Sequence, residues 1–165
     1  MVIGGIAQFN ALPAAQAEDQ LHGCLPNHRW AARLVAGRPY RDPDDLLVAA
    51  DINAGDLTDQ EWLEAIAAHP RIGEGGGHSP DSSAREQSRV LQASVETLDA
   101  LAAENRHYEK RFGHVFLIAA SGRSGDEILG ELRRRMNNNP ATELEEAKRE
   151  LRKIVQIRLR KLLSG

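Results

Sequence analysis

Hydrophobic and polar positions follow a helical pattern along most of this chain. Segments rich in Ala, Leu, Glu and Arg alternate with prolines, glycines and an Asn–Asn–Asn–Pro turn, which interrupt helices. The pattern predicts helices near residues 14–21, 28–37, 43–53, 58–68, 83–104, 125–136 and 141–163.

Two of these helices carry signals for their first turn. Thr58 and Glu61 fit a capping box, and Leu57 and Trp62 fit the hydrophobic staple around it. Ser83 and Glu86 have the spacing of a second capping box, which predicts a helix start at Ser83.

One apolar run, residues 115–120, breaks the helical pattern. It ends at Ser121–Gly122 and fits either a buried extended strand or a buried helical turn. Because no partner strand is evident elsewhere, we expect an all-α, single-domain helical bundle with one short extended buried segment. A length of 165 residues suits one domain, 1–165.

Composition narrows the class of protein. Hydrophobic residues make up 41% and charged residues 27% of the chain, which is typical of a globular protein. No apolar run approaches the roughly 20 residues of a membrane helix. The mildly apolar residues 1–10 lack the basic n-region of a secretory signal peptide. We therefore expect a cytoplasmic protein that does not enter a membrane. Cys24 is the one cysteine, which excludes an internal disulfide and a cysteine-based metal cage.

The charge distribution gives little support to nucleic-acid binding. The net charge is −3, and aromatic residues make up 4% of the chain. Residues 148–161 hold seven basic residues and one acidic residue, so a basic terminal helix that binds nucleic acid stays an alternative. We expect no nucleic-acid partner.

An arginine lies on the apolar face of the last predicted helix. At about 100° per residue, Arg158 falls inside an arc formed by Leu144, Ala147, Leu151, Ile154, Val155 and Leu162. A buried guanidinium keeps its charge and needs an anion beside it. Arg158 either pairs with a buried carboxylate, extends to the rim of the core, or binds a substrate carboxylate through two parallel hydrogen bonds.

A histidine ends the apolar face of the helix near residues 58–68. Trp62, Ile66 and His69 are spaced i, i+4, i+7, and Pro70 disfavours helical geometry at His69. His69 therefore lies at a helix C-terminus, at the edge of the core. It is either a hydrogen-bonded core histidine or a general acid or base.

Glu86 and Gln87 form a third polar group at a predicted helix start. Gln87 falls on the arc of Leu91, Ser94, Leu98 and Ala102, and Glu86 lies at its edge. Glu86 either completes the capping box or binds a ligand. With His69 and Arg158, these residues suit a small anionic substrate and proton transfer without a metal.

Weaker candidates are a metal site and a nucleophile near Cys24. His22, Cys24 and His28 have the pattern H-x-C-x(3)-H, but no fourth ligand is evident, and nothing marks Cys24 as reactive. The glycines at 73–77 lack the Lys–Ser/Thr ending of a phosphate-binding loop. We therefore expect no metal ligands and no nucleotide site.

Several motifs together resemble one enzyme family, from about Phe9 to Leu163. They are FNALP at 9–13, RW at 29–30, HPRIG at 69–73, SAREQ at 83–87, Y-x-x-RFG-x-x-FLI at 108–118 and KI-x-x-IRL at 153–159. Their order and intervals are similar to those of 2-oxo-4-hydroxy-4-carboxy-5-ureidoimidazoline (OHCU) decarboxylases of urate degradation. Any one motif alone would be weak, but the set is specific.

The resemblance implies an all-α homodimer that converts its ureidoimidazoline carboxylate substrate to (S)-allantoin and carbon dioxide without a cofactor. It implies a catalytic role for His69, Glu86 and Arg158. It also implies substrate binding by Pro70, Ser83, Gln87 and the backbone of Phe116, Leu117, Ile118, Ala119 and Ala120. The glycine-rich loop Gly73–Ser82 resembles no motif, and the sequence leaves open whether it is a flap over the site.

Two other function classes stay open at this point. One is an enzyme that acts on a neighbouring ureide intermediate. The other is a helical interaction module that has kept the fold and lost turnover, although the intact His69, Glu86, Gln87 and Arg158 argue against it.

Overall fold

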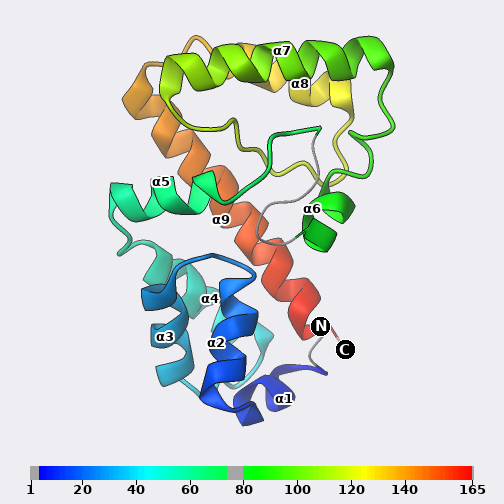
Figure 1. Ribbon diagram of the computed structural model, residues 1–165. Coiled ribbons are helices and arrows are strands. Elements are labelled where there is room, and N and C mark those ends of the chain that lie inside the picture. The colour runs from blue at the N-terminus through cyan, green and yellow to red at the C-terminus, as the bar shows by residue number, and fades with distance from the viewer. Residues whose placement is uncertain (1–3, 74–79, 165) are drawn as a thin grey trace. The chain divides into compact units, whose positions relative to one another are not determined.

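The computed structural model describes residues 4–73 and 80–164, and within these ranges it contains nine helices and no strand (Figure 1). The predicted all-α fold class is confirmed. Most of the glycine-rich loop Gly73–Ser82, residues 74–79, lies outside the described residues, so the question of a flap stays open. Within the described ranges, no helix has the length and hydrophobicity needed to cross a bilayer.

The chain divides into two compact units. One comprises residues 1–65 and 152–165, and the other comprises residues 66–151. Helices α5 and α9 each contribute to both units. The single domain over 1–165 stays a prediction.

The first unit is built from short helices around a buried tryptophan. Trp30 is buried, and its indole N–H donates to the Ala50 carbonyl at 3.0 Å. Helix α2 packs on α3, and α3 packs on α4, as Figure 1 shows. The unit contains α1 (Ile6–Ala11), α2 (Ala14–His22), α3 (His28–Ala36), α4 (Pro43–Ala54), most of α5 (Asp59–Ala67) and the end of α9 (Pro140–Leu163).

The capping box at Thr58 is confirmed. The Glu61 N–H donates to the Thr58 hydroxyl at 3.1 Å, and the Thr58 N–H donates to the Glu61 carboxylate at 3.0 Å. Leu57 and Trp62 are buried beside it, as a hydrophobic staple requires. Glu61 also accepts a hydrogen bond from Asn27, which caps α3, so one carboxylate links the starts of two helices.

The Glu61 carboxylate makes stability depend on pH. Hydrogen bonds from the Arg29 side chain, the Thr58 backbone and Asn27 lower the pKa of Glu61 from 4.5 to about 2. Because the pKa is lower in the folded chain, this stabilisation is complete above pH 4.5 and is lost as the pH falls toward 2. We expect Glu61→Gln to lower the melting temperature at pH 7, and the difference from wild type to shrink below pH 4.5.

Thermal unfolding followed by circular dichroism at a series of pH values measures this effect. Glu64→Gln, on the exposed side of the same helix, makes the same charge change and serves as the control. An equal loss of stability in both variants at pH 7 would contradict the assignment to the capping network.

The second unit is built on two packed helices. It contains α6 (Pro80–Glu86), α7 (Val95–Phe112), α8 (Gly125–Arg135) and the start of α9. Helix α7 packs on α8. A Cβ atom at Gly125 would lie 2.7 Å from the Ala93 Cβ and 3.1 Å from the Thr97 Cγ2, so only glycine permits this close approach. The core holds Ile72, Val90, Leu101, Tyr108, Phe116, Ile118, Ala120, Ile128, Leu129 and Leu132.

The prediction of a single helix near 83–104 is wrong. Helix α6 ends at Glu86, the chain turns through 87–94, and α7 begins where the Ser94 side chain accepts from the Thr97 N–H at 3.2 Å. Ser83 and Glu86 therefore belong to α6, and the second capping box is not formed there. Helical propensity alone did not reveal that Ser94 starts a new helix.

The inward arc predicted for that helix is also wrong. Leu91 and Ala102 are exposed, whereas Gln87 is buried as predicted. The buried face of α7 is instead Leu101, Asn105 and Tyr108.

The non-helical segment at 115–120 is confirmed. These residues belong to no helix or strand, and Phe116, Leu117, Ile118 and Ala120 are buried. The Phe116 ring meets the Tyr108 ring edge-on, with centroids 5.3 Å apart. An irregular backbone segment thus runs through the core of the second unit.

Candidate active site

His69 lies just beyond the end of α5, as predicted. The backbone N–H of His69 donates to the Ile66 carbonyl at 3.1 Å, and the residue is 6% exposed. Pro70 follows directly and leaves the helical path. The imidazole is therefore a buried group at a helix C-terminus, which suits a proton-transferring side chain shielded from bulk water.

Helix α7 holds the segment that follows His69. Asn105 is buried and donates its amide N–H to the Ile72 carbonyl at 3.2 Å. Arg71 and Glu109 form a bidentate ion pair: Nε donates to Oε1 at 2.6 Å, and Nη2 donates to Oε2 at 3.1 Å. Since Asn105 and Glu109 are one helical turn apart, a single face of α7 fixes the backbone after the histidine. Asn105 was not among the residues predicted from the sequence, although its i, i+4 spacing from Leu101 places it on an apolar face.

Ser83, Glu86 and Gln87 are buried at the end of α6, with exposures of 2%, 8% and 5%. The Gln87 Oε1 accepts from the Gly73 N–H at 2.9 Å, which joins this group to the segment after His69. That contact fixes the orientation of the amide, so its Nε2 is the atom that can donate to a ligand. A carboxylate buried as deeply as that of Glu86 is typical of a functional or strongly hydrogen-bonded site.

Two charged side chains hold the backbone of residues 116–120. The Arg135 Nη1 donates to the Leu117 carbonyl at 2.7 Å, and the Ala119 N–H donates to the Glu150 Oε1 at 3.2 Å. Between these bonds, Ile118 is 3% exposed, and its backbone N–H and C=O bond to no residue that the structure describes. Buried backbone groups are almost always paired, so this donor and acceptor are candidates for ligand contacts.

Arg158 lies on α9 and belongs to the unit formed by 1–65 and 152–165, whereas the residues described above belong to the unit 66–151. It is 4% exposed, and the arc predicted around it is buried except for the half-buried Leu144. The alternative that it extends to the rim of the core is therefore wrong. A buried carboxylate partner and a substrate carboxylate stay open as its counterion.

The weaker metal candidate has no support in the geometry. The His22 and His28 rings stack with centroids 4.6 Å apart. The pKa of His22 is lowered, first by burial of the ring and second by the charge of the neighbouring His28. Cys24 is buried. Within residues 4–73 and 80–164, no group of three or more His, Cys, Asp or Glu side chains could hold a metal ion.

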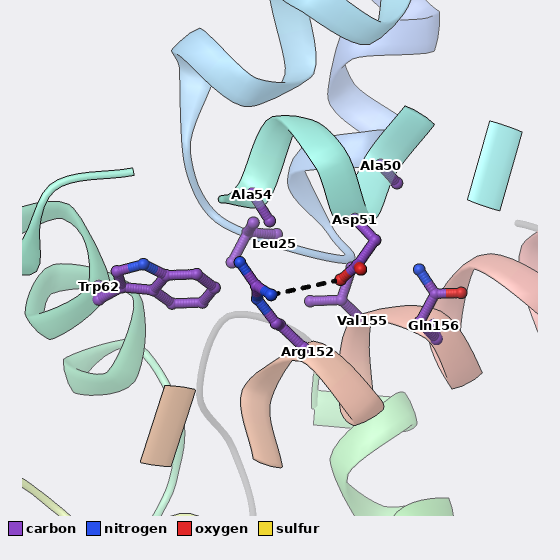
Figure 2. A pocket seen from close by; sticks show the side chains of 8 residues that line it. All are labelled: Leu25, Ala50, Asp51, Ala54, Trp62, Arg152, Val155 and Gln156. Carbon is purple, nitrogen blue, oxygen red and sulfur yellow. Dashed lines mark ion pairs between the residues drawn. The ribbon is translucent and has the colours of Figure 1, made fainter. Parts of the chain in front are cut away.

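A small cavity in the first unit contains none of the predicted site residues. Figure 2 shows Arg152 between Trp62 and Asp51: its guanidinium lies 5.7 Å from the Trp62 ring centroid and 3.9 Å from the Asp51 carboxylate. The cavity measures about 10 Å³, room for about one water molecule. Its lining is Leu25, Ala50, Asp51, Ala54, Trp62, Arg152, Val155 and Gln156. We therefore interpret it as a packing defect beside an ion pair.

Comparisons with known proteins agree on one family. The sequence model of the family described as OHCU decarboxylase matches residues 10–160. The uric acid degradation bifunctional protein TTL of Arabidopsis thaliana is 36% identical over 153 residues, which cover 89% of this chain. The chain spans 47% of that longer protein.

Two further relatives match over nearly their whole length. The OHCU decarboxylase of Haloferax volcanii is 27% identical over 165 residues, which cover 97% of this chain and 96% of the relative. A crystal structure of an OHCU decarboxylase in the presence of (S)-allantoin is 32% identical and superposes with a TM-score of 0.79. That match covers 89% of this chain and 99% of the solved chain.

Proposed function

The chain belongs to the OHCU decarboxylase family, and we propose that it converts OHCU to (S)-allantoin and carbon dioxide in urate degradation, without a cofactor. The observation that carries the proposal is the set of buried polar residues at the family's motif positions. His69, Ser83, Glu86 and Gln87 are all less than 10% exposed and belong to one compact unit.

The substrate can supply the electron sink for its own decarboxylation. When the bond from the ring carbon to the carboxylate breaks, its electron pair moves through the ring to the imine nitrogen, which takes up one proton. The resulting enol then loses its hydroxyl proton, while the neighbouring ring carbon, which bears the ureido group, gains one. The products are carbon dioxide and a ring carbonyl, and proton delivery from one face sets the S configuration.

The buried residues fit the steps of this reaction. We assign the proton transfer to His69, with Glu86 steering the imidazole, and the binding of the substrate carboxylate or a ring oxygen to Arg158. Pro70, Ser83 and Gln87 would line the ring. The backbone of 116–120 would hold the ring edge, since the Ile118 N–H and C=O are a buried donor and acceptor that bond to no described residue.

A coupled assay tests the proposed reaction. Fresh urate, a urate oxidase and a hydroxyisourate hydrolase generate OHCU, and circular dichroism follows the allantoin that forms. We expect a rapid (S)-allantoin signal only when this chain is present. Racemic allantoin that forms no faster than without the chain would contradict the proposal and favour a non-catalytic module or a neighbouring ureide as substrate.

We also propose a cytoplasmic homodimer, which the resemblance of the motifs implies. Light scattering coupled to gel filtration is the test of the assembly, and we expect twice the mass of one chain. A mass equal to one chain at micromolar concentration would contradict the dimer while leaving the proposed reaction in place.

The Gln87 amide is expected to contribute to substrate affinity. Gln87→Met keeps the side-chain length but removes the hydrogen bonds, so we expect KM to rise about tenfold with a smaller change in kcat. The coupled assay at varied substrate concentration measures both constants. Gln92→Met, at an exposed position of the same turn, is the control and should leave KM unchanged. An unchanged KM in Gln87→Met would exclude this contact.

A further inference from the structure

Two peptide groups flank Ile118, and a different charged side chain holds each of them. Arg135 of α8 donates to the Leu117 carbonyl at 2.7 Å. Glu150 of α9 accepts from the Ala119 N–H at 3.2 Å. Both bonds lie within the unit 66–151.

These two bonds decide where the Ile118 backbone groups point. Both peptides are trans, and in a trans peptide the C=O and N–H point in opposite directions. The Leu117 carbonyl shares its peptide plane with the Ile118 N–H, so this N–H points away from Arg135. The Ile118 carbonyl shares its plane with the Ala119 N–H, so this carbonyl points away from Glu150. The two side chains thus orient a donor and an acceptor that make no hydrogen bond to any described residue.

Arg135 is itself held by a buried network. Its side chain is 1% exposed and pairs with Glu143, which is completely buried; the Arg135 Nε lies 3.1 and 3.0 Å from the two carboxylate oxygens. The Tyr108 hydroxyl donates to the same carboxylate. The guanidinium carbon also lies 4.5 Å from the Phe116 ring centroid, directly over the segment it holds.

The position of this ion pair suggests a role beyond stability. Desolvation offsets most of the attraction within a buried ion pair, and apolar replacements of similar volume are often as stable. The arrangement does provide a rigid donor at the Leu117 carbonyl, because Nη1 is free to bind it while Nε and Nη2 bind Glu143. A flexible apolar side chain could not supply that donor.

We propose that Arg135, fixed by Glu143, and Glu150 are positioning residues for the decarboxylation, which aim the Ile118 N–H and C=O at the substrate ring. The inference rests on the proposed function. None of these three side chains needs to touch the substrate, since Arg135 and Glu150 bind the backbone of 117–119 and Glu143 acts through Arg135.

The first test removes both charges of the ion pair together. In Arg135→Met/Glu143→Met, the core keeps apolar side chains of similar length, but the Leu117 carbonyl loses its donor. We expect kcat/KM to fall on the order of 100-fold, mainly through a higher KM, because a displaced binding group weakens the bound state. Tyr108→Phe is the matched control: it removes one hydrogen bond to Glu143 but keeps the ring that packs on Phe116 and the bond from Arg135 to Leu117, so kcat/KM should stay within about threefold of wild type.

Hydrogen exchange measured by NMR separates positioning from general destabilisation. In the double variant, the Ile118 and Ala119 amides should exchange faster than in wild type, while amides in the middle of α7 stay protected. Tyr108→Phe should leave the exchange at Ile118 and Ala119 unchanged. Equal losses of activity in the double variant and in Tyr108→Phe would overturn the inference.

Glu150 provides a second test that remains available if the double variant does not fold. Glu150→Gln keeps an oxygen acceptor for the Ala119 N–H and should retain most of the activity, whereas Glu150→Leu should raise KM. Equal KM values in these two variants would overturn the inference. If wild type itself makes no (S)-allantoin, the proposed function fails. Faster exchange of the Ala119 amide in Glu150→Leu than in Glu150→Gln would still show that Glu150 anchors this backbone, and equal exchange would contradict it.

Discussion

We expect His69→Asn to lower kcat by about 10²- to 10⁴-fold, the usual contribution of a general acid or base, while the chain stays folded. Asparagine keeps a polar group of similar size but cannot exchange a proton near neutral pH. The His69 ring is buried, and the backbone around it is tied down at Ile66 and at Ile72. The substitution should therefore remove chemistry without moving the surrounding chain.

The coupled assay gives kcat, and thermal unfolding shows whether the fold survives. His69→Ala should lose as much activity as His69→Asn, since neither side chain transfers a proton. His107→Asn, at an exposed position of α7, is the control and should keep wild-type turnover. Retention of more than about a tenth of wild-type activity in His69→Asn would rule out the assigned role, given the size of general acid–base effects.

Local signals predicted much of the fold. The start of α5 was predictable because a capping box and a hydrophobic staple act within a few residues of each other. The break between α6 and α7 was not, because Ser83 and Ser94 both fit a helix start by sequence. Gln87, the first residue after α6, instead accepts a hydrogen bond from the Gly73 N–H, 14 residues away. A contact of that range has no periodic signal.

The candidate site was predictable where a polar residue interrupts an apolar face. Arg158 and His69 stood out for that reason, and both are buried. Glu143 and Glu150 could not be recognised in this way. At about 100° per residue, they lie about 20° and 40° outside the apolar arc of α9. Arg135 ends a run of three arginines, and its burial depends on a partner in another helix. Such pairs become visible only when the helices are packed.

Arg158→Met is expected to lower kcat/KM on the order of 1000-fold, since truncating one partner of a buried charge pair costs about 2–5 kcal/mol. Arg158→Lys should lose on the order of 100-fold, because an ammonium keeps the charge but not the two parallel hydrogen bonds of a guanidinium. Arg158 is 4% exposed and lies among Ile154, Val155 and Leu162. Its charge therefore cannot be satisfied by water, and an anion must supply the contact.

The identity of that anion separates a substrate-binding arginine from a structural one. If it is the substrate, free guanidinium added to Arg158→Gly should restore part of the lost turnover, and the rescue should saturate with guanidinium concentration. If it is a carboxylate of the protein, Arg158→Met should lose stability in proportion to its activity, and Arg158→Lys should keep most of both. We expect the first pattern, with the larger defect in KM, because carboxylate binding precedes the loss of carbon dioxide.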